Sequence, residues 1–284
     1  MPIQLDINDV SQTAFLTLQC HAMDAKSNKP LLNDPSAQQT LDRLKEGTSG
    51  DANREFFQRL AQDKVSANLV VHSALRSKYY DQCVRDFVRL HPQATVVNIG
   101  CGLDHRFERV DNGQLTFIDL DLPDLMAIKS QLFPPQGRYH QVAQSVFDFS
   151  WMDQIKQGPM ILVAEGVFMY CREDDVKSLF RTLADRFPGS EMLCEVFSSK
   201  WLTGWRKRAM ESKLQRELKL GPGTTFQFGI PKSEAMEAWH PEIKLIDDWS
   251  YFDSEELESP VMKWLGRFPR FRQVQWTVRY RLGS

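Results

Sequence analysis

The hydrophobic positions divide the chain into a helical first third and a later part of short apolar runs. Between residues 8 and 90, apolar residues recur without strand-like alternation, and a polar loop interrupts them at 44–53. Residues 79–90 place Val84, Phe87 and Val88 at helical spacing. His91-Pro92 ends this segment, because a residue before proline disfavours the α region. The first third is therefore predicted to be helical.

From residue 95 onward, short apolar runs alternate with helical segments. The runs are 95–100, 115–120, 139–143, 160–166 and 190–197, and an amphipathic helix is predicted over 173–187. Strands that alternate with helices indicate an α/β fold, with a mostly parallel sheet covered by helices on both faces.

The last third changes character again. Residues 200–218 are basic and helical in pattern, and closing strands are predicted at 242–247 and 274–282. Apolar and polar residues alternate along the final run, as in an antiparallel strand added to a parallel sheet. We interpret the chain as one domain (1–284): a helical N-terminal cap (1–92), a cofactor-binding core (93–197), a lid or substrate segment (198–240) and closing strands (241–284).

Composition and charge narrow the function classes. The 284 residues contain 35 Lys and Arg against 37 Asp and Glu, so no basic excess points to nucleic acid or to a membrane partner. The first ten residues lack the basic and apolar pattern of a signal peptide, and no run reaches the ~18 apolar residues of a membrane helix. Five cysteines without a C-x-x-C pair indicate no zinc site and favour a cytoplasmic protein.

The most informative stretch is VVNIGCGLDHRF (96–107), where an apolar strand runs into a glycine loop. Gly100 and Gly102 allow the backbone to turn tightly and to approach a ligand closely. A single G-x-G is weak evidence by itself. Its position at the end of the first strand of an α/β series indicates a nucleotide-type cofactor.

Two acids follow the next predicted strand, in FIDLDLP (117–123). Asp119 and Asp121 lie about 20 residues after Gly100, where an acid of this type binds a ribose diol. A helix-capping acid in a solvated turn is the alternative for either residue. The third glycine of the dinucleotide fingerprint is replaced by His105. This favours S-adenosylmethionine, which has a ribose but no pyrophosphate, over NAD or FAD.

Three motifs in this order, VVNIGCGLDHRF, DLDLP and AEGVFMY (164–170), resemble the leucine carboxyl methyltransferase family. Its branch of tetracenomycin-type polyketide O-methyltransferases is the most similar. The resemblance implies a Rossmann-like, seven-stranded methyltransferase sheet with an antiparallel C-terminal strand. It also implies S-adenosyl-L-methionine as methyl donor and a carboxylate acceptor on a small molecule.

The resemblance also assigns site residues. Arg76 stands where the family has an arginine that contacts the methionine carboxylate of the cofactor. Gly100 and Gly102 match the glycine loop, and Asp121 matches the ribose acid better than Asp119 does. Glu165 matches a glutamate beneath the methionyl part of the cofactor.

Two positions depart from the family pattern. Ser145 and Val146 stand where an Asp-Leu pair usually brackets the adenine, so adenine binding is expected to be weaker unless Asp148 contributes. His21 stands near a position where relatives carry Arg or Lys. A surface histidine is the favoured interpretation, and a substrate contact is the alternative.

The catalytic assignment rests on Tyr170, which either orients the acceptor or packs as a core aromatic. The other histidines show no metal spacing, and no metal is expected. A carboxylate acceptor is ionised at neutral pH and needs no general base, whereas a phenol would need one. The alternatives to a carboxyl methyltransferase are a phenolic O-methyltransferase, a cofactor-binding protein without activity, and an NAD-dependent oxidoreductase. Four aromatics are candidates for an apolar acceptor pocket or for the core: Trp201, Trp205, Phe226 and Phe228.

Overall fold

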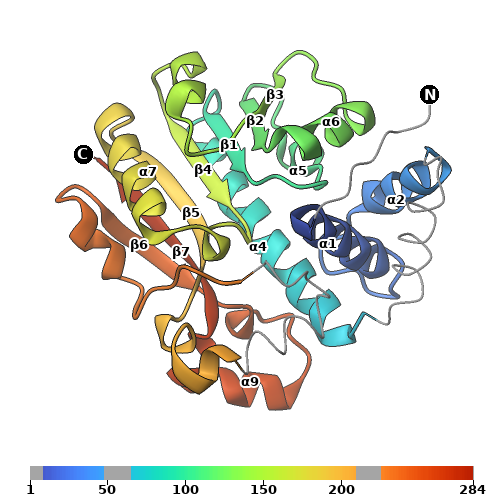
Figure 1. Ribbon diagram of the computed structural model, residues 1–284. Coiled ribbons are helices and arrows are strands. Elements are labelled where there is room, and N and C mark those ends of the chain that lie inside the picture. The colour runs from blue at the N-terminus through green and yellow to red at the C-terminus, as the bar shows by residue number, and fades with distance from the viewer. Residues whose placement is uncertain (1–8, 48–64, 209–224, 284) are drawn as a thin grey trace.

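The computed structural model describes residues 9–47, 65–208 and 225–283 and contains a seven-stranded sheet (Figure 1). Its order is β3-β2-β1-β4-β5-β7-β6. All neighbouring pairs from β3 to β5 are parallel, and β7 runs antiparallel to β5 and β6. The strands are β1 (Thr95–Ile99), β2 (Thr116–Asp121), β3 (Tyr139–Ala143), β4 (Met160–Ala164), β5 (Ser190–Phe197), β6 (Lys244–Trp249) and β7 (Gln275–Leu282). The predicted mostly parallel sheet with an antiparallel C-terminal strand is therefore confirmed.

The alternating sides of a strand explain why both faces of the sheet are covered. In β4, Ile161 and Val163 belong to the core that includes α4 (Ala67–Leu90). Leu162 and Ala164 belong to the core on the other face, which includes α7 (Glu173–Arg186). A continuously apolar run such as MILVA is the pattern that this double burial requires.

Helix α4 is longer than the helix predicted over 79–90. The Ser66 side chain accepts a hydrogen bond from the Leu69 amide and caps its first turn, and the helix ends at the predicted boundary before His91. Helices α1 (Asp9–Ala25) and α2 (Pro35–Gly47) pack on each other, and α1 also contacts α4. Figure 1 shows them in blue beside α4.

The remaining elements connect the strands. Short helices α5 (Arg106–Val110) and α6 (Pro123–Leu132) follow β1 and β2, and α9 (Pro260–Gly266) and α10 (Pro269–Arg272) lie between β6 and β7. Of the basic helix predicted over 200–218, residues 204–208 are helical, and 209–218 lie outside the described residues. Within the described ranges, no helix has the length and apolarity needed to cross a membrane. The proposed division into cap, core and lid stays a prediction.

Candidate active site

The predicted site residues gather at one edge of the sheet, where the parallel strands end. Gly100 and Gly102 follow β1, Asp121 is the last residue of β2, and Glu165 follows β4 directly. Ligands of open α/β sheets bind outside this edge. The other predicted residues are Ser145 and Val146 after β3, Tyr170 in the 3-10 helix η2 (Phe168–Tyr170), and Arg76 in α4.

Both loop glycines have backbone conformations that side chains disfavour. Gly100 has φ of +60°, and a Cβ there would lie 2.4 Å from Cγ2 of Val167. Gly102 has φ of +55°, and a Cβ there would lie 3.4 Å from Cβ of Ala14 in α1. The loop is therefore tightly enclosed at Gly100. Only glycine fits that position unless Val167, which lies after β4, moves away.

Asp121 turns toward this glycine loop. Its Oδ2 accepts a hydrogen bond from the Gly102 amide at 2.8 Å, and its Oδ1 accepts one from the Leu122 amide at 2.8 Å. Burial raises the pKa of this carboxyl group, and the two amide donors partly oppose that effect. Each oxygen keeps a lone pair that can accept a further hydrogen bond.

Asp119 has a different environment. Its side chain is buried and accepts hydrogen bonds from Asn98 Nδ2 at 2.8 Å and from the Tyr139 hydroxyl at 2.6 Å. Lys129 Nζ lies 2.8 Å from its Oδ2. These partners occupy Asp119 within the core. Asp121 is thus the acid of this pair that remains available at the loop.

The structure brings Arg76 and Glu165 together with an acid that the sequence did not single out. Arg76 Nε donates to Glu165 Oε1 at 2.8 Å, and Nη1 donates to Glu195 Oε2 at 2.9 Å. A Cβ on Gly166 would lie 3.9 Å from Arg76 Nη1, so the guanidinium lies close against the backbone that follows β4. Two carboxylates therefore fix two edges of the guanidinium plane.

Glu165 is held by three donors. Besides Arg76, the Ser77 hydroxyl donates to Oε1 at 2.7 Å, and the Arg106 guanidinium donates to Oε2. Burial acts to raise the pKa of Glu165, but Arg76 and Arg106 outweigh it, and the pKa lies at about 2. Glu165 is consequently ionised at neutral pH and holds Arg76 in place.

Glu195 lies near the carboxyl end of strand β5 and is nearly fully buried. Its Oε1 accepts a hydrogen bond from Gln275 Nε2 at 2.8 Å, and burial raises its pKa against the opposing charge of Arg76. The detectable sequence signal was the presence of two acids, Glu191 and Glu195, inside the buried strand SEMLCEVF. A buried acid requires a partner; Glu191 is paired with Arg279, and Glu195 with Arg76 and Gln275.

Tyr170 lies beside this group and also packs on the core. Its ring meets Phe226 edge to face, with centroids 5.1 Å apart. Burial, with a contribution from Glu195, raises the pKa of its hydroxyl to about 12. The phenol is therefore a hydrogen-bond donor at neutral pH and not a base. Phe226 and Phe228 are core residues, whereas Trp205 is exposed.

Ser145 and Val146 are half-buried after β3. Ser145 Oγ accepts a weak hydrogen bond from the Phe147 amide at 3.3 Å, and the Val146 carbonyl accepts one from Trp151 Nε1 at 3.0 Å. Asp148, considered as a substitute acid, caps a 3-10 helix through the Ser150 amide at 3.2 Å.

The expectation that His21 is a surface residue is wrong, since its side chain is 1% exposed. His21 Nε2 lies 3.1 Å from Ser77 Oγ, and Nδ1 faces Asp34 and Asp104 at 3.6 and 3.9 Å. These three groups have the spacing of a metal site, but Arg109 Nη1 already bonds both carboxylates, at 2.9 and 2.7 Å. The guanidinium supplies the cation that the two acids need.

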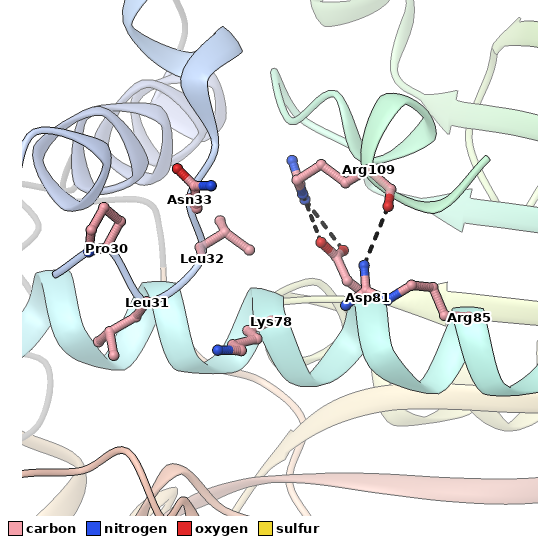
Figure 2. Close-up of a pocket in the computed structure, with 8 residues that line it drawn as sticks. All are labelled: Pro30, Leu31, Leu32, Asn33, Lys78, Asp81, Arg85 and Arg109. Carbon is pink, nitrogen blue, oxygen red and sulfur yellow. Dashed lines mark hydrogen bonds and ion pairs between the residues drawn. The ribbon is translucent and has the colours of Figure 1, made fainter. Parts of the chain in front are cut away.

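A cavity of about 430 Å³ lies between α4 and the linker that joins α1 to α2 (Figure 2). Figure 2 shows Asp81 accepting hydrogen bonds from Arg109 at its wall. None of the predicted site residues lines this cavity; its lining is Pro30, Leu31, Leu32, Asn33, Lys78, Asp81, Arg85 and Arg109. The cavity is therefore separate from the candidate cofactor site, although Asp81 and Arg109 belong to the charge network behind it.

His105 explains why the loop does not suit a dinucleotide. Its ring stacks on Phe133 with centroids 4.0 Å apart, and Nδ1 lies 3.1 Å from Glu108 Oε2. A side chain thus fills the position where the dinucleotide fingerprint needs glycine for close packing of helix and strand.

Comparisons with known proteins agree with this geometry. The leucine carboxyl methyltransferase family matches residues 14–184. The tetracenomycin polyketide synthesis O-methyltransferase TcmP of Streptomyces glaucescens is 29% identical over 96% of this chain and 97% of its own length. The S-adenosyl-L-methionine-dependent methyltransferase dpfgK of Gibberella zeae is 26% identical over 68% of this chain and 66% of its own length.

Solved structures agree at the level of the fold. A protein of Thermobifida fusca assigned as a methyltransferase has a TM-score of 0.58 at 14% identity, over 86% of this chain and 94% of that one. The family match covers more than half of the chain and includes the glycine loop, Asp121 and Glu165. The chain therefore belongs to the leucine carboxyl methyltransferase family, which confirms the expectation of an S-adenosylmethionine-dependent O-methyltransferase.

Proposed function

We propose that this protein transfers a methyl group from S-adenosylmethionine to a carboxylate of a small, largely apolar molecule and releases a methyl ester. The observation that carries the proposal is the group Arg76–Glu165–Glu195 at the edge where the parallel strands end. With two edges of its guanidinium held, Arg76 can offer its remaining donors to the methionine carboxylate of the cofactor.

The nucleoside part of the cofactor fits the other side of the same edge. Gly100 and Gly102 keep the loop free of side chains, and the open lone pairs of Asp121 suit the two ribose hydroxyls. Ser145 and Val146 lie after the next strand and would border the adenine. When bound, the cofactor supplies an electrophilic methyl group on its sulfonium.

A carboxylate acceptor suits the side chains around this point. Transfer requires the acceptor to be aligned and water to be excluded, and an ionised carboxylate needs no proton removed. Tyr170 keeps its proton and would orient the acceptor by donating a hydrogen bond. His72, one helical turn before Arg76, has its pKa lowered by burial to about 3 and is therefore a weak base. Methylation of a phenol would need a base to remove its proton, and neither Tyr170 nor His72 is suited to that role.

The test is a screen of aromatic carboxylic acids and phenols with a cofactor that carries a deuterated methyl group, read by mass. We expect labelled products that mild alkali hydrolyses to the original acid, as methyl esters do. The rate should change little between pH 6 and 9, because the acceptor stays ionised. An alkali-stable product, and a rate that climbs with pH, would instead identify a phenolic acceptor. Absence of turnover with bound cofactor would identify a binding protein.

A further inference from the structure

Two short segments at the carboxyl edge of the sheet contain lysines, arginines and tryptophans but no aspartate or glutamate. Residues 199–208 follow β5, and residues 260–272 lie between β6 and β7. The Ser198 amide donates to the Val274 carbonyl at 3.0 Å, so the two segments leave the sheet at adjacent points. Figure 1 shows α9, in the second segment, at the lower side of the molecule. We call these two segments the basic–aromatic rim.

The rim is unusual within this chain. Its bases include Lys200, Arg206, Arg208, Lys263, Arg267 and Arg270, although the whole chain has more acids than bases. Arg272 is paired with Asp248 and Asp253 and is not available. Two acids just before the second segment form ion pairs elsewhere, Glu256 with Lys78 at 2.7 Å and Glu258 with Lys29 at 2.9 Å. Glu258 also acts electrostatically on Lys263, and Lys263 Nζ donates to the Glu255 carbonyl at 3.2 Å. The uncompensated positive charge of the second segment is therefore carried mainly by Arg267 and Arg270.

Large apolar side chains project between these bases. Trp205, Val261 and Trp264 are 73%, 65% and 55% exposed. The aromatics of the second segment form a continuous surface, because Trp264 lies 5.0 Å from Phe268 and Arg270 stacks over Phe268 at 5.6 Å. Exposed tryptophans flanked by Lys and Arg are the composition of proteins that lie on a lipid headgroup layer.

We propose that the basic–aromatic rim docks the protein on an anionic lipid surface. Each basic residue near such a surface is attracted by its negative potential, and the tryptophan rings can enter the interface between headgroups and acyl chains. The rim borders the edge of the sheet that holds the candidate active site. Docking would therefore bring the site close to the bilayer, where an apolar acceptor concentrates.

The test is co-sedimentation of the full chain with vesicles of phosphatidylcholine alone or with 30% phosphatidylglycerol, roughly the range of anionic membranes. We expect binding only to the anionic vesicles, weakening as salt increases. Arg267→Glu with Arg270→Glu should lower the partition coefficient by about tenfold or more. Trp205→Ala with Trp264→Ala should lower it as well, with salt dependence retained.

The matched control is Arg89→Glu with Lys156→Glu, two exposed bases at the opposite edge of the sheet that give the same change in net charge. The control should bind vesicles like the parent chain, and all variants should keep the parent's melting temperature and S-adenosylhomocysteine affinity. Failure to sediment, or an equal loss in the control, would overturn the proposal. Binding to poly-glutamate without binding to vesicles would overturn it in favour of an acidic protein partner. Each result is independent of whether the acceptor is a carboxylate.

Discussion

At the methionine end of the proposed cofactor site, every charge already has a protein partner. Arg76 bridges Glu165 and Glu195, and Glu165 also accepts from Ser77 and Arg106. At the nucleoside end, Asp121 forms no ion pair with another described residue and accepts hydrogen bonds from two backbone amides. The Ser145 hydroxyl accepts one weak hydrogen bond. One end is a buried network and the other is a pair of nearly independent side chains.

This difference separates two kinds of preorganisation. A network fixes the direction of its donors, but the loss of one member leaves buried charges behind. An isolated acid binds less rigidly, and its loss is felt mainly by the ligand. Substitutions at the methionine end should therefore affect both folding and binding, whereas those at the nucleoside end should affect binding alone.

The largest effect is expected at Arg106, which is 1% exposed and bonds Asp81, Asn98 and Glu165. Arg106→Met should lower the free energy of unfolding by about 3–5 kcal/mol, because it leaves buried carboxylates without a partner. The value should lie toward the lower end, since Arg109 still pairs with Asp81 and Arg76 with Glu165. Urea unfolding measures the change.

Arg186→Met is the matched control for this experiment. Its ion pair with Asp153 is exposed, and such pairs contribute less than about 1 kcal/mol. Equal losses in the two variants would mean that the network behind Glu165 contributes no more than a surface pair, and the contrast between the two ends would fail.

A smaller effect, on binding, is expected from Arg76→Lys. Lysine keeps the charge but cannot bridge Glu165 and Glu195 while also meeting the cofactor carboxylate. Affinity for S-adenosylhomocysteine should fall by about 10- to 150-fold, the equivalent of about 1.5–3 kcal/mol. Calorimetry measures it, and methylthioadenosine, which lacks the amino acid, is the control ligand.

Glu195→Gln sharpens the same comparison, because it removes the negative charge beside Arg76 and leaves the guanidinium unchanged. Its loss of S-adenosylhomocysteine affinity should be smaller than that of Arg76→Lys. A loss of methylthioadenosine affinity in either variant would show general damage to the site and would contradict the assigned role of Arg76.

Asp121→Ala should weaken binding of both ligands by about 1–3 kcal/mol, or about 5- to 150-fold, because both contain the ribose. Stability should not fall. Since the pKa of Asp121 is raised in the folded protein, its ionisation weakens folding as pH increases through that pKa.

The affinity of the parent chain should decline on acidification while Glu165 is still ionised, and Asp121→Asn should remove that pH-dependent step. A variant with unchanged affinity would place the ribose elsewhere.

Much of the fold was predictable from the sequence. MILVA and SEMLCEVF are buried on both faces. MILVA is continuously apolar, and SEMLCEVF is mostly apolar, which is the pattern of a strand covered on both faces. The final strand was visible because one residue in two is apolar. The position of Asp121 was also predictable, since the end of a strand and its distance from the glycine loop are local features of the chain.

The partners within the site were not predictable in this way. Arg76 meets Glu195 across 119 positions of the chain, and His21 meets Ser77 across 56. Neither residue type nor local spacing encodes such pairs, because they depend on how separate elements pack. His21 has the polarity of a surface residue, and it is buried because α1 packs on α4 and because Asp34 and Asp104 lie against its ring.

The smallest effect is expected from Ser145→Asp, which is also the one substitution expected to raise cofactor affinity. The family pattern has an acid at this position, and a carboxylate can accept a charge-assisted hydrogen bond from the adenine amine. The Phe147 amide that now reaches Ser145 Oγ at 3.3 Å can donate to an aspartate as well, so the local turn should be kept. Affinity for S-adenosylhomocysteine should rise by about fivefold, or about 1 kcal/mol.

The control ligand decides whether this gain belongs to the nucleoside end. Methylthioadenosine contains the adenine but lacks the amino acid, so its affinity should rise by the same factor, and Arg76→Lys should not alter that factor. Ser145→Ala, which removes the hydroxyl without adding charge, should leave affinity within about twofold, because one weak neutral contact is lost. If the gain appears with S-adenosylhomocysteine alone, position 145 acts through the methionine network, and the two ends are not independent.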